Sequence, residues 1–486
     1  MTTHQTLHTH PGSPPPARSA DPPRPPQKWF GALLLRLHFY AGILVGPFIL
    51  IAATSGALYA LSPQLEQAVY ADVLRAPPTA DPLSLGEQVG IAQERIGEEA
   101  TLTAVRPAPD PGDTTRVMFD QDGLGDSESR AVFIDPGTGQ VLGDMTVYGT
   151  SGALPLRTWI DQLHRSLHLG DAGRFYSELA ASWLWIVALA GLGLWIVRLR
   201  RARVKKDLLR PRRGLAGRRR LSGWHASLGI WIVLGALFLS ATGITWSQLA
   251  GTNVTNLRTA LNWGTPTVST SLENPAGTVD EHAHHHGDAA SAPGGPEPAS
   301  TDPAIFDAVL ATSQQVNVNT GLVEIRPPAD EGTAWLVQEI QRSFPTEVDA
   351  VAIDGATLEA TDRVDFAEFS LPAKLARWGI DLHMGSMFGL ANQIALFFLA
   401  AGIATMVVLG YLMWWKRRPT RESRSPVGTP PRRGVLGRAP WWGLAALATG
   451  AILIALALPL VGWTLLGFLV LDTLIGLSRQ RRVPSP

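Results

Sequence analysis

Long apolar runs separated by polar stretches are the main pattern along this chain. Four runs are long enough to cross a hydrocarbon core of about 30 Å as helices, and they lie at residues 37–61, 179–197, 224–249 and 388–415. A fifth run at 441–477 carries Pro459 and Gly462 near its middle, where these residue types favour a turn. The pattern therefore predicts an all-α transmembrane helix bundle, with a four-span core and a C-terminal two-helix hairpin.

Two long polar segments separate the spans, and each begins with helical spacing, at 83–96 and at 304–316. Short alternating runs typical of strands follow, at 101–105, 115–119, 130–134 and 140–142 in the first segment and at 322–325, 334–339, 349–353 and 361–364 in the second. The repeated order indicates an approximate duplication into two small α+β domains. Because the strands are short, each domain has a modest core, and we expect it to rely on packing against its neighbour or the bundle.

Charge is distributed unevenly between the loops, although the formal net charge is zero. Residues 198–220 hold twelve Lys or Arg against one acid, and residues 416–440 hold eight against one. Residues 63–178 hold eight basic side chains against eighteen acids, and residues 251–380 hold six against eighteen. Short cytoplasmic loops retain Lys and Arg during insertion. We therefore expect a multi-pass protein of the bacterial inner membrane, with both termini in the cytoplasm and both α+β domains outside.

These patterns set the expected boundaries. The cytoplasmic parts are a proline-rich disordered tail at 1–28, loops at 201–221 and 416–440, and a tail at 479–486. The membrane parts are 29–62, 161–200 (an outer approach helix and a span), 222–249, 377–415 and the hairpin 441–478. The extracytoplasmic domains occupy 63–160 and 250–376, and the second contains a His-rich flexible insert at 274–302.

Five histidines lie at or near the ends of the predicted spans. His38 and His225 lie near the cytoplasmic ends of spans one and three, whereas His164, His168 and His383 lie on the outward approaches to spans two and four. A low-spin haem with two histidine ligands needs one imidazole on each face of the ring. The sequence therefore predicts two haem b groups, an inner one held by His38 and His225 and an outer one held by His164 and His383. The absence of cysteine excludes thiolate-bound haem, c-type haem attachment and iron–sulfur ligation.

Further side chains could assist these sites. Arg36, Arg165 and Arg377 lie where they could neutralise haem propionates, and His168, four residues after His164, could replace it or bind a propionate. Four histidines of the insert could bind a transition metal, or belong to a weakly binding linker: His282, His284, His285 and His286. The alternative for the span-end histidines is that they hydrogen-bond to lipid or to neighbouring helices without any cofactor.

Residues 29–418 resemble the PepSY-associated transmembrane proteins, which include inner-membrane ferric-siderophore reductases. The resemblance rests on four motifs: Arg36-Leu-His38 with Gly42, Leu163-His164-Arg-Ser-Leu with Gly170, Trp224-His225-Ala-Ser-Leu-Gly229 with Thr242-Gly243, and His383-Met-Gly385 with Phe388-Gly389. The outward segments resemble PepSY domains, most clearly at 133–139 and more faintly at 351–354. The resemblance implies a bundle that binds haem b and passes electrons to an iron(III) chelate, such as a ferric siderophore, held outside.

The partners expected are the lipid bilayer, an electron donor and an iron chelate, with no nucleic acid. The inner loops contain no Gly-rich dinucleotide fingerprint, so the donor is a separate cytosolic reductase or the quinol pool. The acidic balance of the outward segments suits cationic or neutral chelates and free metal ions.

Two rivals to a haem-dependent oxidoreductase follow from the same sequence. In the first, the outward domains bind or restrain an extracytoplasmic peptidase or sensor, and the helices only anchor them, without enzymatic activity. In the second, the protein is a metal-uptake accessory that captures ions with the His-rich insert.

Overall fold

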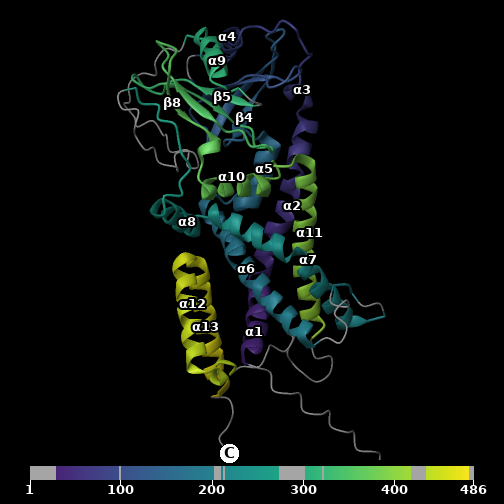
Figure 1. Cartoon of the computed structure of the whole chain (residues 1–486). Coiled ribbons are helices and arrows are strands. Elements are labelled where there is room, and N and C mark those ends of the chain that lie inside the picture. Colours follow the sequence, from purple (N-terminus) through teal and green to yellow (C-terminus); the bar gives the residue numbers. More distant parts are fainter. Residues whose placement is uncertain are drawn as a thin grey trace, which may run out of the picture.

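The computed structural model describes residues 29–97, 100–201, 209–211, 214–272, 302–319, 322–417 and 434–480. A bundle of long helices forms one layer, and a β-sheet with two covering helices lies across one end of it (Figure 1). We refer to this end of the bundle as the sheet end and to the other as the far end.

Four helices are long and apolar enough to cross a membrane by length and composition: α2 (Gly46–Val69), α6 (Gly170–Arg201), α7 (Gly217–Thr245) and α11 (Gly389–Trp415). Helix α2 packs along α11, and α6 packs along α7. Large apolar side chains on the outside of the bundle, such as Leu234 (78% exposed) and Phe398 (67% exposed), have no protein neighbour to cover them. A membrane-embedded bundle buries such side chains in the lipid bilayer, so the chain is a membrane protein in contact with lipid.

The first apolar run forms two helices rather than one. Helix α1 (Trp29–Leu44) ends before Val45, and α2 begins at Gly46. Pro47 has no backbone N–H to continue the α1 ladder, which favours the break at this point. The sequence predicted a single span over 29–62, so its extent is approximately correct but its continuity is wrong.

The C-terminal run forms the predicted hairpin. Helix α12 (Trp441–Ala457) and α13 (Pro459–Gln480) pack against each other, and the chain turns at Leu458. Their apolar stretches are shorter than those of the four long helices, so a membrane crossing by the hairpin stays a prediction. The hairpin lies beside the far half of the bundle (Figure 1).

Shorter helices connect the bundle to the sheet. They are α3 (Ala71–Leu74), α5 (Pro155–Ser166), α8 (Leu249–Ala260) and α10 (Leu371–Met384). Helices α5 and α10 lie between the sheet and the long helices (Figure 1). Two 3₁₀ turns, Phe366–Glu368 and Leu436–Arg438, precede α10 and α12.

The two polar segments between the long helices form two units that share one eight-stranded antiparallel sheet with the strand order β4-β3-β2-β1-β5-β6-β7-β8. The first unit contributes β1 (Thr101–Arg106), β2 (Thr115–Asp120), β3 (Glu128–Ile134) and β4 (Val141–Tyr148). The second contributes β5 (Val323–Arg326), β6 (Trp335–Glu339), β7 (Ala350–Ile353) and β8 (Ala360–Val364). The units join where Val105 of β1 pairs with Ile325 of β5.

The two faces of the sheet pack against different partners. One face forms a continuous apolar core with α4 (Leu85–Ile96) and α9 (Ile305–Gln315), to which both units contribute, for example through Phe119 and Val337. The two helices are also joined at their ends, because the Asp307 carboxylate accepts hydrogen bonds from the Leu85 and Gly86 amides at 2.8 Å each. The opposite face points towards the bundle, so side chains on alternate strand positions reach α5 and the ends of the long helices.

Candidate functional site

The inner pair, His38 and His225, lies inside the bundle. The two imidazole rings come from α1 and α7, and their centroids are 6.0 Å apart with an angle of 76° between the ring planes. Nδ1 of His38 is 3.0 Å from the Val187 carbonyl oxygen on α6, which leaves Nε2 as the free nitrogen of that ring. The Met406 backbone lies near His225, but no bond of normal geometry forms, and Nδ1 of His225 is buried without a hydrogen-bond partner among the described residues.

The outer pair, His164 and His383, lies on α5 and α10, at the sheet end of the bundle. Nδ1 of His164 is 3.0 Å from Oγ of Ser55 on α2, and Nδ1 of His383 contacts Oγ1 of Thr242 on α7. Each short helix therefore presents its histidine to a hydroxyl group on a long helix, and in both cases that hydroxyl group contacts Nδ1.

Burial keeps both outer imidazoles neutral. It lowers the pKa of His164 to about 4, and it lowers the pKa of His383 to about 3, with a further contribution from the neighbouring His164 ring. A neutral imidazole retains the lone pair that a metal ligand requires.

Glycines lie directly behind one imidazole of each pair. A Cβ on Gly191 of α6 would be 3.0 Å from Cε1 of His38, and a Cβ on Gly56 of α2 would be 3.0 Å from Cε1 of His164. A Cβ at either position would require the ring to shift by a few tenths of an ångström. One imidazole of each pair, His38 or His164, thus has an anchored Nδ1 and a glycine against the ring edge.

A family model described as the PepSY-associated TM region matches residues 35–417. The match covers most of the chain and includes both histidine pairs and the whole sheet. This chain belongs to the PepSY-associated TM region family. No curated protein matches it.

The remaining predicted residues of this PepSY-associated membrane protein occupy different places. Helix α5 ends at Ser166, and both Leu167 and His168 have left-handed backbone conformations. His168 is therefore not on the same helical face as His164; it is exposed, and its ring lies against Trp159 with centroids 5.0 Å apart. The structure does not bring His168 into the outer pair.

Each of the three predicted arginines already has a protein partner. Arg36 lies 3.4 Å from the Asp472 carboxylate of the hairpin, Arg377 donates to Asp381 at 2.9 Å, and Arg165 donates to the Tyr148 hydroxyl. Arg165 and Arg377 nevertheless lie on the same helices as His164 and His383. A role of these arginines towards propionates stays a prediction, and the sequence could not show their pairing, because it depends on tertiary contacts.

The His-rich insert lies outside the described residues, so His282, His284, His285 and His286 stay a prediction. Within the part of the chain that the structure describes, no group of three or more His, Asp or Glu side chains could hold a metal ion. The pairs at the bundle ends are two-histidine arrangements, which suit a ligand that brings its own equatorial donors.

Sequence reasoning missed several polar groups around the outer pair. Tyr59 of α2 stacks on His164 with centroids 6.4 Å apart, and Arg157 of α5 lies over the Tyr59 ring at 5.6 Å. Arg342, from the segment between β6 and β7, reaches the same place and donates to Sδ of Met384, next to His383. Arg157 could have been suspected from its position one turn before Asp161 on α5, whereas only the fold brings Arg342 here.

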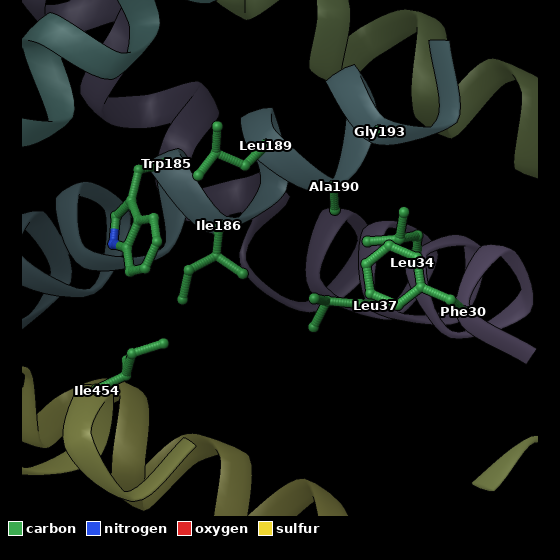
Figure 2. Close-up of a pocket in the computed structure, with 9 residues that line it drawn as sticks. All are labelled: Phe30, Leu34, Leu37, Trp185, Ile186, Leu189, Ala190, Gly193 and Ile454. Carbon is green, nitrogen blue, oxygen red and sulfur yellow. The ribbon is translucent and has the colours of Figure 1, made fainter. Parts of the chain in front are cut away.

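A cavity of about 360 Å³ lies beside the inner pair, between α1, α6 and α12. Figure 2 shows its apolar lining, with Leu37 of α1, Ala190 of α6 and Ile454 of the hairpin around the space. Ala190 is adjacent to Gly191, which contacts His38. The only polar atom on its lining residues' side chains is the Trp185 indole nitrogen, which is buried without a partner among the described residues.

Proposed function

We propose that this protein is a haem b electron-transfer protein of the bacterial inner membrane, which reduces an iron(III) chelate on the extracytoplasmic side. The observation that carries the proposal is the close approach of His38 and His225, whose ring centroids lie 6.0 Å apart with 76° between the ring planes. Two imidazoles that bind one metal ion from opposite sides at about 2 Å each have centroids roughly 6 Å apart. The separation of the inner pair therefore suits one iron atom between the rings.

The surroundings of both pairs fit a haem. The Val187 carbonyl and the Ser55 hydroxyl orient His38 and His164, so that Nε2 points away from each anchor. Gly191 and Gly56 leave room for the edges of the His38 and His164 rings. When bound, haem b supplies reversible one-electron transfer between Fe(III) and Fe(II).

The protein's own residues position this chemistry. One pair lies towards the far end of the bundle and the other at the sheet end, so the four histidines mark two steps along a path through the membrane. The basic loops at 198–220 and 416–440 support a cytoplasmic far end and an extracytoplasmic sheet. Electrons would enter at His38 and His225 and leave near His164 and His383.

The chain would receive electrons from a separate donor, either a cytosolic reductase or a quinol. The apolar cavity of about 360 Å³, whose lining includes Leu37, supports the quinol, because the apolar tail of a quinol suits such a lining. The family resemblance supports an iron(III) chelate, and in particular a ferric siderophore, as the acceptor outside.

The proposal is tested by reducing the purified, haem-loaded protein without oxygen and mixing it rapidly with ferric siderophores or ferric citrate. We expect the α-band of reduced haem to decay as the chelate is added, with one Fe(II) formed for each electron lost. His168→Ala is a matched control, since His168 is exposed and lies against Trp159, and it should react like the wild type. Reduced haem that is stable towards every iron(III) chelate would overturn the reductase role and favour the peptidase- or sensor-binding rival.

A further inference from the structure

A layer of buried charge lies between the sheet and the outer pair. Alternate residues of the central strands point towards the bundle, and there they meet charged residues of α2, α5 and α10. Six arginines and four acids make up this layer: Arg106, Arg116, Arg157, Arg165, Arg342 and Arg377 with Glu66, Asp161, Glu324 and Asp381. The layer therefore carries more positive than negative groups.

Each acid of the layer lies beside an arginine. Arg106 pairs with Glu324 at 2.6 Å, Arg157 lies 3.7 Å from Glu66, and Arg377 pairs with Asp381. The charges of Arg165 and Arg157 both act on Asp161. Arg116 and Arg342 have no carboxylate at ion-pair distance within the described residues.

Arg116 and Arg342, the two arginines without a carboxylate at ion-pair distance, lie in an electrostatically unfavourable environment. Burial, together with the neighbouring guanidinium groups, lowers the pKa of Arg116 and the pKa of Arg342 to about 10 each. Arg116 uses its guanidinium on the Gly152 carbonyl and over the Phe133 ring. Arg342 donates hydrogen bonds to Oγ1 of Thr150 and to Sδ of Met384, neither of which carries a negative charge. A guanidinium has five N–H donors, so Arg342 retains unused ones.

Arg157 has an unused donor as well. Its Nε is buried without a partner among the described residues, while its Nη2 lies 3.4 Å from the Tyr59 hydroxyl. Arg157 contacts Tyr59, which stacks on His164, and Arg342 contacts Met384, which adjoins His383, so each arginine lies one residue away from the outer pair. Buried N–H groups without partners are costly, and an anionic oxygen would satisfy them.

We propose that Arg157 and Arg342 form a carboxylate-binding site between the sheet and the outer histidines. The site deepens the proposed function, because its ligand is either a propionate of the outer haem or a carboxylate of an iron chelate such as ferric citrate. The acidic balance of the outward segments indicated cationic or neutral chelates. The bundle-facing side of the sheet carries the opposite charge, so a carboxylate chelate matches the surface that faces the haem.

The test uses the full-length, haem-loaded protein with Arg157→Gln and Arg342→Gln. Arg95→Gln is the matched control, because Arg95 lies on α4, on the other side of the sheet, where its side chain is 58% exposed. Binding of citrate and of ferric citrate is measured by calorimetry, with a neutral hydroxamate chelate for comparison. A redox titration with optical detection follows the midpoint potential of each haem.

If the ligand is a chelate carboxylate, both layer variants weaken citrate and ferric citrate binding at least tenfold, while hydroxamate binding and both potentials are unchanged. If the ligand is a propionate, the wild type does not bind citrate, and both variants lower the potential of one haem, since loss of a positive charge favours Fe(III).

Arg342→Lys should restore either property in part, which excludes misfolding as the cause. Unchanged binding and unchanged potentials in both variants would refute the site. Absence of haem from the wild type would instead overturn the proposed function. The calorimetric titration with citrate would still test whether Arg157 and Arg342 bind a carboxylate.

Discussion

The positions of two proposed haem ligands, one in each pair, depend on two residues of a neighbouring helix. His38 depends on Val187 and Gly191 of α6, and His164 depends on Ser55 of α2 and its neighbour Gly56. The carbonyl or hydroxyl group orients the ring, and the glycine makes room for it. These supporting residues explain why the two pairs are equivalent although they lie on unrelated segments.

Replacing a supporting glycine should remove one haem only. In Gly191→Leu the new side chain begins 3.0 Å from Cε1 of His38 and displaces that ring, so we expect the haem content to fall to about half. Gly56→Leu should cause the same loss at the outer pair. The haem-to-protein ratio of purified variants measures this, with Gly450→Leu as the control because no atom lies within 4 Å of the corresponding Cβ. A full haem complement in both variants would contradict the assignment.

Asp307 should make a large contribution to the stability of the sheet domain. Its carboxylate accepts hydrogen bonds from the Leu85 and Gly86 amides at the start of α4. A residue of the second unit therefore caps a helix of the first. We expect Asp307→Ala to lower the free energy of unfolding by about 2 kcal/mol, as for a strong N-cap. Thermal unfolding in detergent measures the loss, compared with Asp110→Ala on an exposed turn.

At the scale of secondary structure, the joining of the two units was the least predictable feature. The strands and the covering helices could be located from alternation and helical spacing, and β2, β6 and β8 lie within one residue of their expected ranges. The pairing of β1 with β5 could not be predicted, because it links residues more than two hundred positions apart. The prediction of two separate α+β domains therefore becomes one shared sheet with a common core.

The end of α5 is a second feature that could not be predicted from the sequence. Continued helical spacing placed His168 beside His164, but the helix stops at Ser166, and α6 begins at Gly170. A Cβ on Gly173 would be 1.8 Å from the Ser166 carbonyl oxygen, so the two helices meet too closely for α5 to continue. This packing constraint is not visible in the periodicity. The structure places His164 and His383 in the last turns of α5 and α10, as expected, whereas His38 lies in the middle of α1 and His225 lies within α7.

The central strands should be sensitive to acid. Burial alone would raise the pKa of Glu324, but Arg106 and Arg326 hold it at about 2, below its ordinary value of 4.5. A carboxyl with a lowered pKa in the folded state stabilises the protein above pH 4.5, and this contribution is lost as the pH falls from 4.5 towards 2. We expect the sheet to lose stability in that range.

Glu324→Gln tests this expectation. At neutral pH it leaves the buried Arg106 without its partner, which should cost roughly 3 to 5 kcal/mol. The variant should also lose most of the acid-dependent decrease seen in the wild type. Tryptophan fluorescence against pH and denaturant follows both effects through Trp335 in the sheet core. Glu359→Gln, on an exposed turn, is the control and should behave like the wild type.

On the scale of the whole molecule, the family region and the hairpin are distinct parts. The family match ends at residue 417, whereas the hairpin begins at Trp441. The hairpin nevertheless attaches to the bundle through the Arg36–Asp472 ion pair and through the Trp183 indole, which donates to Thr464 at 3.0 Å. It also forms one wall of the apolar cavity beside the inner pair.

Truncation after residue 434 should show which properties of the protein depend on the hairpin. Because no residue of either histidine pair comes from the hairpin, we expect the shortened chain to retain both haems, with a lower unfolding temperature. Loss of the hairpin wall should also slow reduction by a soluble quinol analogue, if the cavity admits the donor. Haem content, thermal unfolding and the rate of quinol-dependent haem reduction measure the three effects. Loss of the inner haem on truncation would show that the hairpin is part of the haem site.

The most direct test of the account is an optical spectrum of the detergent-purified protein from haem-supplied cells, oxidised and dithionite-reduced. It should be compared with the single alanine variants of His38, His225, His164 and His383, and with His168→Ala. The account predicts b-type α-bands in the wild type, loss of one component in the His38 and His225 variants, loss of the other in the His164 and His383 variants, and no change in His168→Ala. A wild-type spectrum without haem would contradict it.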